Sequence, residues 1–546
     1  MLKAAFEAED NLASTSLAHR GVVVAKGGAV ASSQPLAVSA GIAALANGGN
    51  CIDAAIAASA VLCVVEPHNS HLGGDAFIVY YSAKDRETIA FNASGAAPKS
   101  ATRDSYREGI PLHGVRAATV PGLVHCWGEL HQRYASRSFT EALRPAIGYA
   151  RDGYPVGPRV ARVASAAGDL FSRNPFLQTL GLSTNTQIGD LVRQPELAWT
   201  LENIARDGVG TFYNGPVAER IVAGSQGHFT LDDLAAHRTR VLTPLRARYR
   251  DLIFHGQPPP SQGHILLQEL QIVNGFDLTT LDEITRTHLL IEAKKLAFAD
   301  RNAYLADPEW INVPVNALLS GEYASKRRAM IDLQQAMPEY PAGVPLTPVE
   351  QGSETTYFLT ADNEGNAISF IQSVYHGYGS AYVIPETGIL LNNRLTGFVL
   401  DPHSPNVVAP GKRPAHTLNA WLATRPDGSL AYVGGTPGGH IQVQTNLQLA
   451  VNLVDGGDNP QIAIERPRWQ HMTNEGAVSE PVGAGVVEIE ERVGESVVSG
   501  LRSLGHEVLP IGEWAHGSSA QLLAQLPNGT YALGSDPRCD GLAAGI

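Results

Sequence analysis

Hydrophobic and polar positions follow two different periods along the chain, and these predict helices in some segments and strands in others. The longest apolar run, residues 54–65, follows the turn residues 48–50 and ends before Pro67. A membrane span needs about 20 apolar residues, so we expect this run to lie in a buried helix over 51–65. Apolar residues at helical spacing predict further helices at 124–134, 195–207, 230–237, 287–305 and 443–454.

Short segments rich in β-branched and aromatic residues predict strands at 76–81, 355–361, 367–374, 421–424 and 430–434. Five-residue polar loops at 362–366 and 425–429 join four of these strands into two hairpins. Residues 68–75 are predicted to form a loop, and the prolines within 257–263 make that segment irregular. Together the elements predict an α+β fold with antiparallel strands and helices on the sheet faces.

The segment 335–354 (QAMPEYPAGVPLTPVEQGSE) differs in composition from the chain on either side. It is rich in proline and glycine and shows no hydrophobic period. We therefore expect a flexible, exposed linker. At 546 residues, the chain is too long for one simple module and suffices for two closely packed parts.

The net charge of −13 changes the range of expected partners. Nucleic-acid binding needs a basic face, so it is disfavoured, as is an anionic membrane surface. Charged residues make up only 17% of the chain, which argues against disorder. The first residues lack the basic and apolar regions of a signal peptide, so we expect a soluble, cytoplasmic protein. The four cysteines contain no C-x-x-C pair and predict neither disulfides nor a zinc site.

Several common catalytic motifs are missing from the sequence. It contains no G-x-S-x-G, no Walker loop, no G-x-G-x-x-G after a strand and no H-E-x-x-H. His68 and His71 lie near Asp75 and have two interpretations: metal ligands, or loop histidines that bond to the backbone. No third ligand stands at motif spacing, so we favour the second interpretation and expect neither metal nor cofactor.

Thr355 and Thr356 open a predicted strand directly after the proposed linker. Such pairs are common and usually structural. A chain cut before Thr355, however, would carry a free α-amino group, of pKa about 7.7–8.0, beside a hydroxyl. That amino group can accept the proton of the hydroxyl, so one residue supplies both nucleophile and base.

A glycine-rich segment, residues 434–440 (GGTPGGH), connects a predicted strand to a predicted helix. The backbone N–H groups of Gly438 and Gly439 would stand at the helix N-terminus, where an oxyanion hole can form. A phosphate-binding nest and a simple tight turn remain open as alternatives.

The motifs taken together resemble one family, the gamma-glutamyltransferases of the N-terminal nucleophile (Ntn) hydrolases. The resemblance runs in family order from about residue 20 to the end of the chain. The matching stretches include GNCIDAAIAASAVLCVVEPHN at 49–69, LGGDAFI at 72–78, ATVPGL at 118–123, QPPPSQGH at 257–264, AKKLAFADRNAYLADPE at 293–309, ETTYFLTADNEGNAISF at 354–370, PGKRPA at 410–415, TPGGH at 436–440 and SDPRC at 535–539.

The resemblance implies a precursor that cuts itself between Glu354 and Thr355. A large subunit, 1–354, and a small catalytic subunit, 355–546, would stay associated as a heterodimer within one intertwined domain, a four-layer αββα sandwich. A dimer of such heterodimers is left open.

By position match Thr355 is the nucleophile and Thr356 assists processing. Gly438 and Gly439 match the oxyanion donors. Ser373 stands where the family has a second threonine bonded to the amino group of the nucleophile.

The positions that bind the γ-glutamyl group in the family are changed. Ser94 replaces an arginine, and His416 and Thr417 replace two serines. Tyr375, Arg394 and Gly397 replace an asparagine, a glutamine and an aspartate that hold the glutamyl amino group. A cation at Arg394 would repel an ammonium group, but its fork suits a carboxylate; a structural ion pair is the alternative.

We therefore expect an amidohydrolase that acts on a small carboxylate-bearing amide, like the cephalosporin (glutaryl) acylases and oxamate amidohydrolase of the non-glutamyl branch. Arg394, with His416, Thr417, Tyr375 and Ser94 nearby, would position the substrate carboxylate. Two alternatives remain: a true gamma-glutamyltransferase or glutathione hydrolase, and a non-catalytic scaffold that is never processed.

Overall fold

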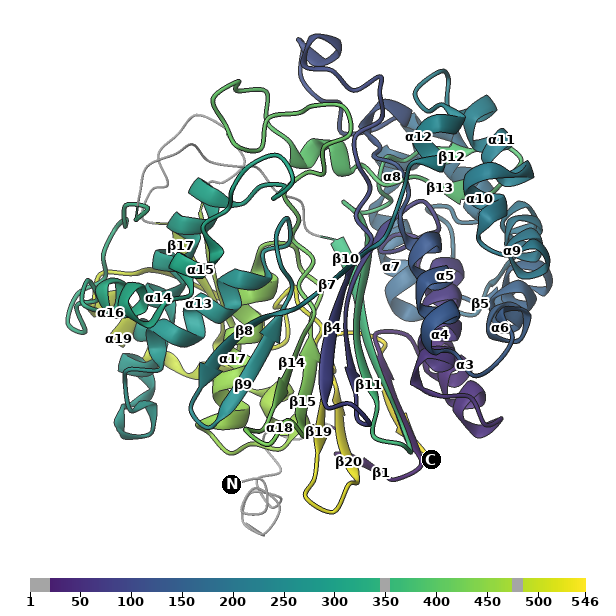
Figure 1. Ribbon diagram of the computed structural model, residues 1–546. Helices are drawn as coiled ribbons and strands as arrows, with labels where there is room; N and C mark the ends of the chain where they lie inside the picture. Colours follow the sequence, from purple (N-terminus) through teal and green to yellow (C-terminus); the bar gives the residue numbers. More distant parts are fainter. Residues whose placement is uncertain (1–19, 344–353, 474–484) are drawn as a thin grey trace.

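Two seven-stranded sheets lie face to face between two layers of helices in the computed structural model, which describes residues 20–343, 354–473 and 485–546 (Figure 1). The first sheet has the order β21 (Leu542–Gly545), β2 (Gly28–Ser32), β10 (Glu354–Asp362), β11 (Ala367–Tyr375), β3 (Asp75–Ser82), β4 (Glu87–Asn92), β7 (Arg240–Leu242). The second sheet has the order β1 (Val23–Ala25), β20 (Tyr531–Ser535), β19 (Gln521–Gln525), β15 (Leu430–Gly435), β14 (Trp421–Thr424), β9 (Leu252–Gly256), β8 (Leu245–Tyr249). The predicted αββα sandwich is thus confirmed.

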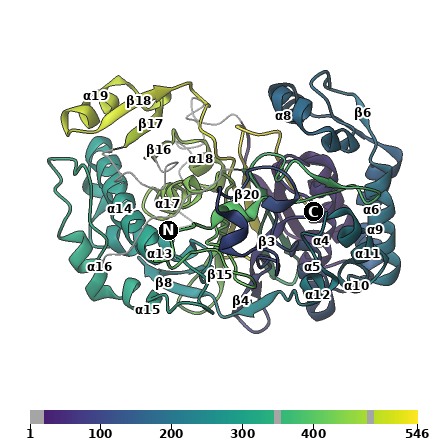
Figure 2. The same ribbon diagram turned by 90° about the horizontal axis from the view of Figure 1, so that it is seen from above.

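The helices form two layers at opposite ends of the molecule when it is seen from above (Figure 2). The layer on the first sheet includes α3 (Pro35–Ala46), α4 (Cys51–Val65), α5 (Leu123–Tyr134), α6 (Phe139–Asp152), α7 (Pro158–Ala166), α9 (Pro195–Asp207), α10 (Gly210–Asn214), α11 (Pro216–Gly224) and α12 (Leu231–Ala235). The layer on the second sheet includes α13 (Gly263–Val273), α14 (Glu283–Tyr304), α16 (Gly321–Arg328), α17 (Ile441–Val454), α18 (Pro460–Glu465) and α19 (Glu495–Ser503).

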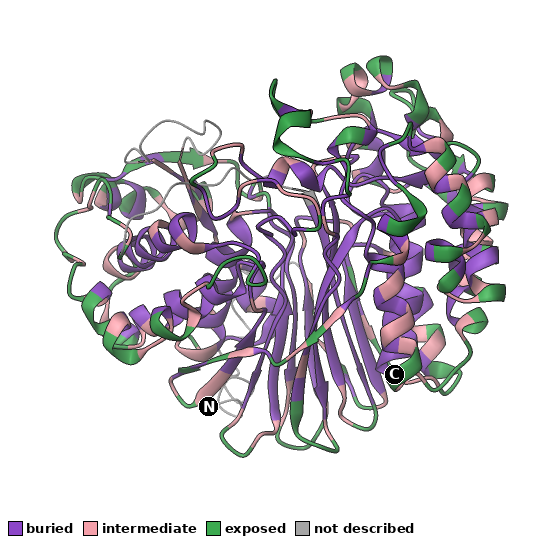
Figure 3. Cartoon of the chain, turned by 45° about the horizontal axis from the view of Figure 1, so that its top comes forward, coloured by how far each residue is buried: buried purple, intermediate pink, exposed green. Residues whose placement is uncertain are grey.

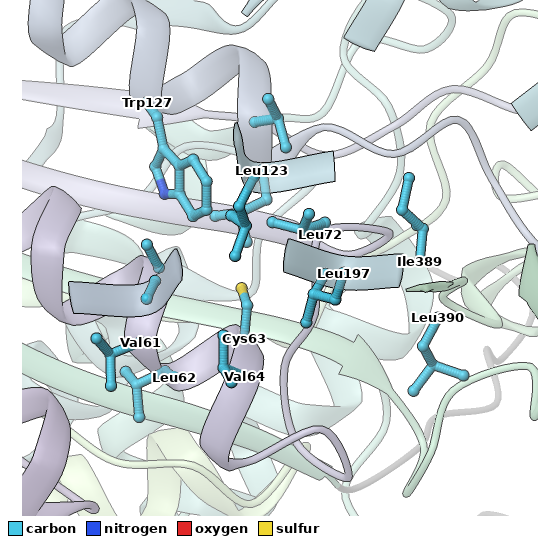
Figure 4. Close-up of a cluster of buried hydrophobic side chains, with 14 of the residues drawn as sticks. Val61, Leu62, Cys63, Val64, Leu72, Leu123, Trp127, Leu197, Ile389 and Leu390 are labelled. Carbon is cyan, nitrogen blue, oxygen red and sulfur yellow. The ribbon is translucent and has the colours of Figure 1, made fainter. Parts of the chain in front are cut away.

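Helix α4 is buried along its whole length, which explains its apolar run. The Asn50 side chain caps its first turn, and the Asp53 side chain accepts from the Asn50 N–H in return, a reciprocal capping box. Its core face packs on side chains of α5 and α9, including Trp127 and Leu197 (Figure 4). This packing holds the carboxyl end of α4 against the first sheet.

The two sheets pack on each other through their inner faces, which are buried (Figure 3). At Gly435, a Cβ atom would lie 2.4 Å from the ring of Tyr357, so only glycine permits this approach. The end of β15 therefore crosses close over the beginning of β10.

Most predicted elements are observed, and the differences have local causes. Helices 51–65 and 195–207 have the predicted bounds. The helix predicted at 287–305 begins earlier, at Glu283, because the Asp282 side chain accepts from the Thr285 N–H and caps it there. The helix predicted at 230–237 is confined to Leu231–Ala235, with Thr230 as its N-cap.

The predicted linker lies partly outside the described residues. Residues 335–343 form no helix or strand, as expected, but they are not all exposed. Tyr340 is buried, and its hydroxyl donates to Glu292 Oε2 at 2.7 Å. This part of the segment is thus fastened to α14. Within the described chain, no helix combines the length and apolarity that a bilayer crossing demands.

His255 connects the two sheets and makes stability depend on pH. Its Nδ1 lies 2.9 Å from Thr88 Oγ1 of β4, and its Nε2 lies 2.9 Å from Thr424 Oγ1 of β14. Burial lowers the pKa of His255 to about 3, and the charge of Arg246 adds to this. The unfolded chain therefore binds more protons than the folded one between pH 3 and about 6.5, and stability falls as the pH decreases through that range.

We expect His255→Gln, which keeps hydrogen-bonding groups but does not titrate, to weaken this dependence. From pH 7 to pH 5 the variant should lose about 2 kcal/mol less unfolding free energy than the parent. Urea unfolding at the two pH values measures this difference. Equal losses in both proteins would contradict the assignment.

Candidate active site

Thr355 lies at the beginning of β10, a central strand of the first sheet. Its side chain is buried, and its Oγ1 donates to Ser373 Oγ at 3.4 Å. Ser373 on β11 is in turn the register partner of Asp75 on β3. Because cross-strand partners share a face of the sheet, Thr355, Ser373 and Asp75 form a row across three neighbouring strands.

The pairing of β10 with β11 is irregular next to Thr355. Glu354 pairs with Tyr375 and Thr356 pairs with Gln372, with a shift of register between them. Tyr375 has φ +88°, in the left-handed region that side chains rarely adopt. Its N–H donates to Ser373 Oγ at 2.7 Å, so this hydroxyl is fixed beside Thr355. Bulges of this kind are common next to active sites, where they reorient side chains.

Gly438 and Gly439 form the turn between β15 and α17, with φ +124° and +57°. Their carbonyl groups accept from the first amides of α17, and Gly439 O also accepts from Gln262 Nε2 at 3.0 Å. Neither glycine N–H has an acceptor among the described residues. Gly435, at the end of β15, lies against Tyr357 of β10, so the glycine turn begins next to the strand that carries Thr355.

Arg394 begins the 3-10 helix η5 (Arg394–Gly397) and is completely buried. Its guanidinium stacks 3.8 Å from the centroid of the Tyr375 ring, and its Nε lies 3.4 Å from Asp75 Oδ2. None of its three nitrogens makes a hydrogen bond within the described part of the chain. Burial lowers the pKa of Arg394, and Asp75 opposes this shift. Asp75 offsets the charge on the Nε side, but the two buried terminal nitrogens have no acceptor within the described chain, which points to a polar ligand.

Asp75 connects the residues of this buried cluster. Its Oδ2 lies 3.3 Å from His416 Nε2, and its Oδ1 accepts from the Gly95 N–H at 2.9 Å. Burial and the charge of Arg394 lower the pKa of His416 to about 3, so the imidazole is neutral near pH 7. His416 thus contacts Asp75 instead of supplying a second cation.

Ser94 and Thr417 are the chain neighbours of Gly95 and His416, which contact Asp75, and both are fixed by neighbouring groups. Ser94 Oγ donates to Asn92 Oδ1 at 2.7 Å, and its carbonyl accepts from Arg413 Nε at 3.0 Å. The Thr417 carbonyl accepts from Gln262 Nε2 at 2.7 Å, the same amide that holds Gly439.

The sequence did not indicate two of the functional candidates. One is Asp75, as the partner of Arg394, and the other is Gln262. Asp75 was considered only as a metal ligand. Its position at the start of a strand, directly after two glycines, was the available signal. Gln262 lies in the segment predicted to be irregular, and nothing in its pattern indicates contact with the glycine turn.

Metal binding has little support from the ligand geometry. His71 Nδ1 accepts from the Leu390 N–H at 3.1 Å, as expected for a structural loop histidine. His68 differs from the prediction, because neither of its ring nitrogens has a hydrogen-bond partner among the described residues. In the described ranges His288, Glu292 and His506 come close enough to share an ion. The Glu292 carboxylate, however, already accepts from Lys295 Nζ and from the Tyr340 hydroxyl, so the hydrogen-bond network accounts for this group.

Known proteins resemble this chain over nearly its full length. A family model described as gamma-glutamyltranspeptidase matches residues 37–546. The glutathione hydrolase-like YwrD proenzyme of Bacillus subtilis is 35% identical over 529 residues, which cover 95% of this chain and 98% of that protein. The oxamate amidohydrolase proenzyme of Klebsiella pneumoniae is 36% identical over 524 residues, which cover 93% and 97%.

A solved structure agrees with the sequence matches. The cephalosporin acylase of Bacillus halodurans superposes with a TM-score of 0.88 at 36% identity, covering 97% of each chain. The matching model, the two relatives and this structure all point to one enzyme family whose members act on amides. The chain belongs to the gamma-glutamyltranspeptidase family of Ntn hydrolases.

Proposed function

We propose that the protein is a self-processing amidohydrolase that cleaves the amide bond of a small carboxylate-bearing substrate. Processing between Glu354 and Thr355 would give subunits 1–354 and 355–546, which remain together as a heterodimer. The proenzyme names of the relatives support this. The oxamate amidohydrolase and the cephalosporin acylase also support amide hydrolysis as the reaction.

The proposed mechanism uses the groups around Thr355. The Thr355 hydroxyl attacks the amide carbonyl carbon, and its own α-amino group accepts the hydroxyl proton. The N–H groups of Gly438 and Gly439 stabilise the oxyanion. The amine leaves with the transferred proton, and water then hydrolyses the Thr355 ester to release the acid. Ser373 keeps the hydroxyl oriented through its contact at 3.4 Å.

The observation that carries the substrate class is the unsatisfied guanidinium of Arg394. It is buried, its two terminal nitrogens have no hydrogen-bond acceptor in the described chain, and it stacks on Tyr375, whose N–H bonds to Ser373. A substrate carboxylate would pair with the two terminal nitrogens, while Asp75 contacts Nε. A glutamyl ammonium group would instead face a cation, and Gly397 offers it no carboxylate.

A panel of amides tests this proposal. Processed protein should hydrolyse half-amides of short dicarboxylic acids, from oxamate to glutaryl amides, at least about tenfold faster in kcat/KM than a γ-glutamyl anilide, since the α-ammonium group of the latter would face the Arg394 cation and a like-charge contact costs several kcal/mol. A preference for the γ-glutamyl compound would favour a true glutathione hydrolase. Absence of both processing and turnover would favour the non-catalytic scaffold.

A further inference from the structure

A buried carboxylate lies close to the proposed cleavage site, on the face of the sheet away from the Thr355 hydroxyl. Glu66 caps the carboxyl end of α4 and is buried. Its two oxygens accept from Ser33 Oγ at 3.1 and 3.0 Å. Ser33 Oγ also lies 2.8 Å from Thr356 Oγ1. The mechanism of amide hydrolysis does not use any of these three groups.

Glu66 lies in surroundings that oppose its negative charge. Burial raises its pKa, and Arg159, Asn69 and the hydroxyls of Thr356 and Ser33 oppose the shift. Asn69 Nδ2 donates to Glu66 Oε2 at 3.3 Å. A carboxylate in such a place costs stability unless hydrogen bonds compensate, so its contacts with the start of β10 need an explanation beyond packing.

Thr356 connects this carboxylate to the cleavage site. Successive side chains of a strand point to opposite faces, so Thr356 faces the helix layer while Thr355 faces Ser373. Fixing Thr356 on one face therefore fixes the rotation of the peptide that carries Thr355. The register shift between Glu354 and Thr356 removes regular backbone pairing there. The side-chain contact of Thr356 with Ser33 therefore contributes more to holding this part of the strand.

We propose that Glu66, Ser33 and Thr356 form a positioning chain for self-cleavage, an inference that rests on the proposed function. In that reaction the Thr355 hydroxyl oxygen bonds to the Glu354 carbonyl carbon, the Glu354–Thr355 C–N bond breaks, and the hydroxyl proton ends on the Thr355 nitrogen. Water then hydrolyses the ester, which yields the Glu354 carboxylate and restores the hydroxyl. The chain holds Thr355 in the orientation from which the first step begins.

A matched pair of variants tests the inference. Thr356→Val removes the hydroxyl of the chain, whereas Thr360→Val removes another buried hydroxyl of β10, which donates to Cys51 O at 2.6 Å. Full-length precursor is produced for each, and the appearance of two fragments is followed on denaturing gels. We expect Thr356→Val to process about 100-fold more slowly, as for a misplaced reacting group, and Thr360→Val to process at the parent rate.

Two further variants separate positioning from folding. Thr356→Ser keeps the hydroxyl and should restore processing, and Glu66→Gln should slow it as Thr356→Val does. Parent-rate processing by Thr356→Val and Glu66→Gln, or equal slowing by Thr360→Val, would overturn the inference. If Glu66→Gln fails to fold, the contrast between Thr356→Val and Thr356→Ser decides. A parent chain that is never cut would instead refute the proposed function.

Discussion

Thr355→Ala is expected to remain a single chain and to hydrolyse no amide. The substitution removes the only hydroxyl that self-scission would place beside a free α-amino group. Loss of a nucleophile typically lowers kcat by roughly 10⁶-fold. Denaturing gels follow the scission, and a half-amide substrate measures turnover.

The matched control for this experiment is Thr355→Ser, which keeps a hydroxyl and should still be cut. Thr355 packs in a buried site of β10, so thermal unfolding must show that the alanine variant is folded. If a folded Thr355→Ala protein turned over substrate normally, Thr355 would not be the nucleophile. If the folded variant were still cut before position 355, the Thr355 hydroxyl would not be the group that cleaves the chain.

Arg394→Lys is expected to lower kcat/KM for a carboxylate-bearing amide by about 100-fold, or roughly 3 kcal/mol. Lysine keeps a charge near Asp75 but loses the planar fork and the stacking on Tyr375 that the guanidinium makes at 3.8 Å. Processing should be unaffected, because the fork binds substrate and not the precursor chain. Steady-state kinetics on the processed variant measure the effect.

A neutral substrate provides the control for Arg394. The methyl ester of the same half-amide carries no carboxylate, so Arg394→Lys should change its kcat/KM by less than about threefold, within the range of an exposed ion pair. An equal loss on both substrates would show that Arg394 is a structural ion-pair partner of Asp75. That outcome would favour γ-glutamyl compounds as the substrate class.

The elements that carry the nucleophile could be predicted because their signals are local. Thr355 and Ser373 lie on strands joined by the short loop 363–366, so a hairpin alone brings them together. Helix α4 was predicted because its apolar run follows the turn residues 48–50 and ends before Pro67; the structure adds that Asn50 caps it. The glycine turn at 438–439 lies between a strand and a helix, as its composition indicates.

The cluster around Arg394 could be predicted only in part, because it depends on contacts between distant segments. Asp75 is separated from Arg394 and His416 by hundreds of positions in the sequence, and it meets them only when β3 lies beside β11. The neutral state of His416 follows from its burial, which the sequence pattern around it does not indicate. In the same way, Tyr340 reads as part of a linker until its hydroxyl is seen to donate to Glu292.

Amino-terminal sequencing of the active protein tests whether Thr355 becomes the first residue of a separate subunit. If self-cleavage occurs as proposed, two polypeptides should co-purify, and the smaller one should begin Thr355-Thr356-Tyr357. The intact masses of both fragments should sum to the mass of the precursor plus one water. A protein that turns over its amide substrate while the peptide bond before Thr355 remains whole would contradict the account.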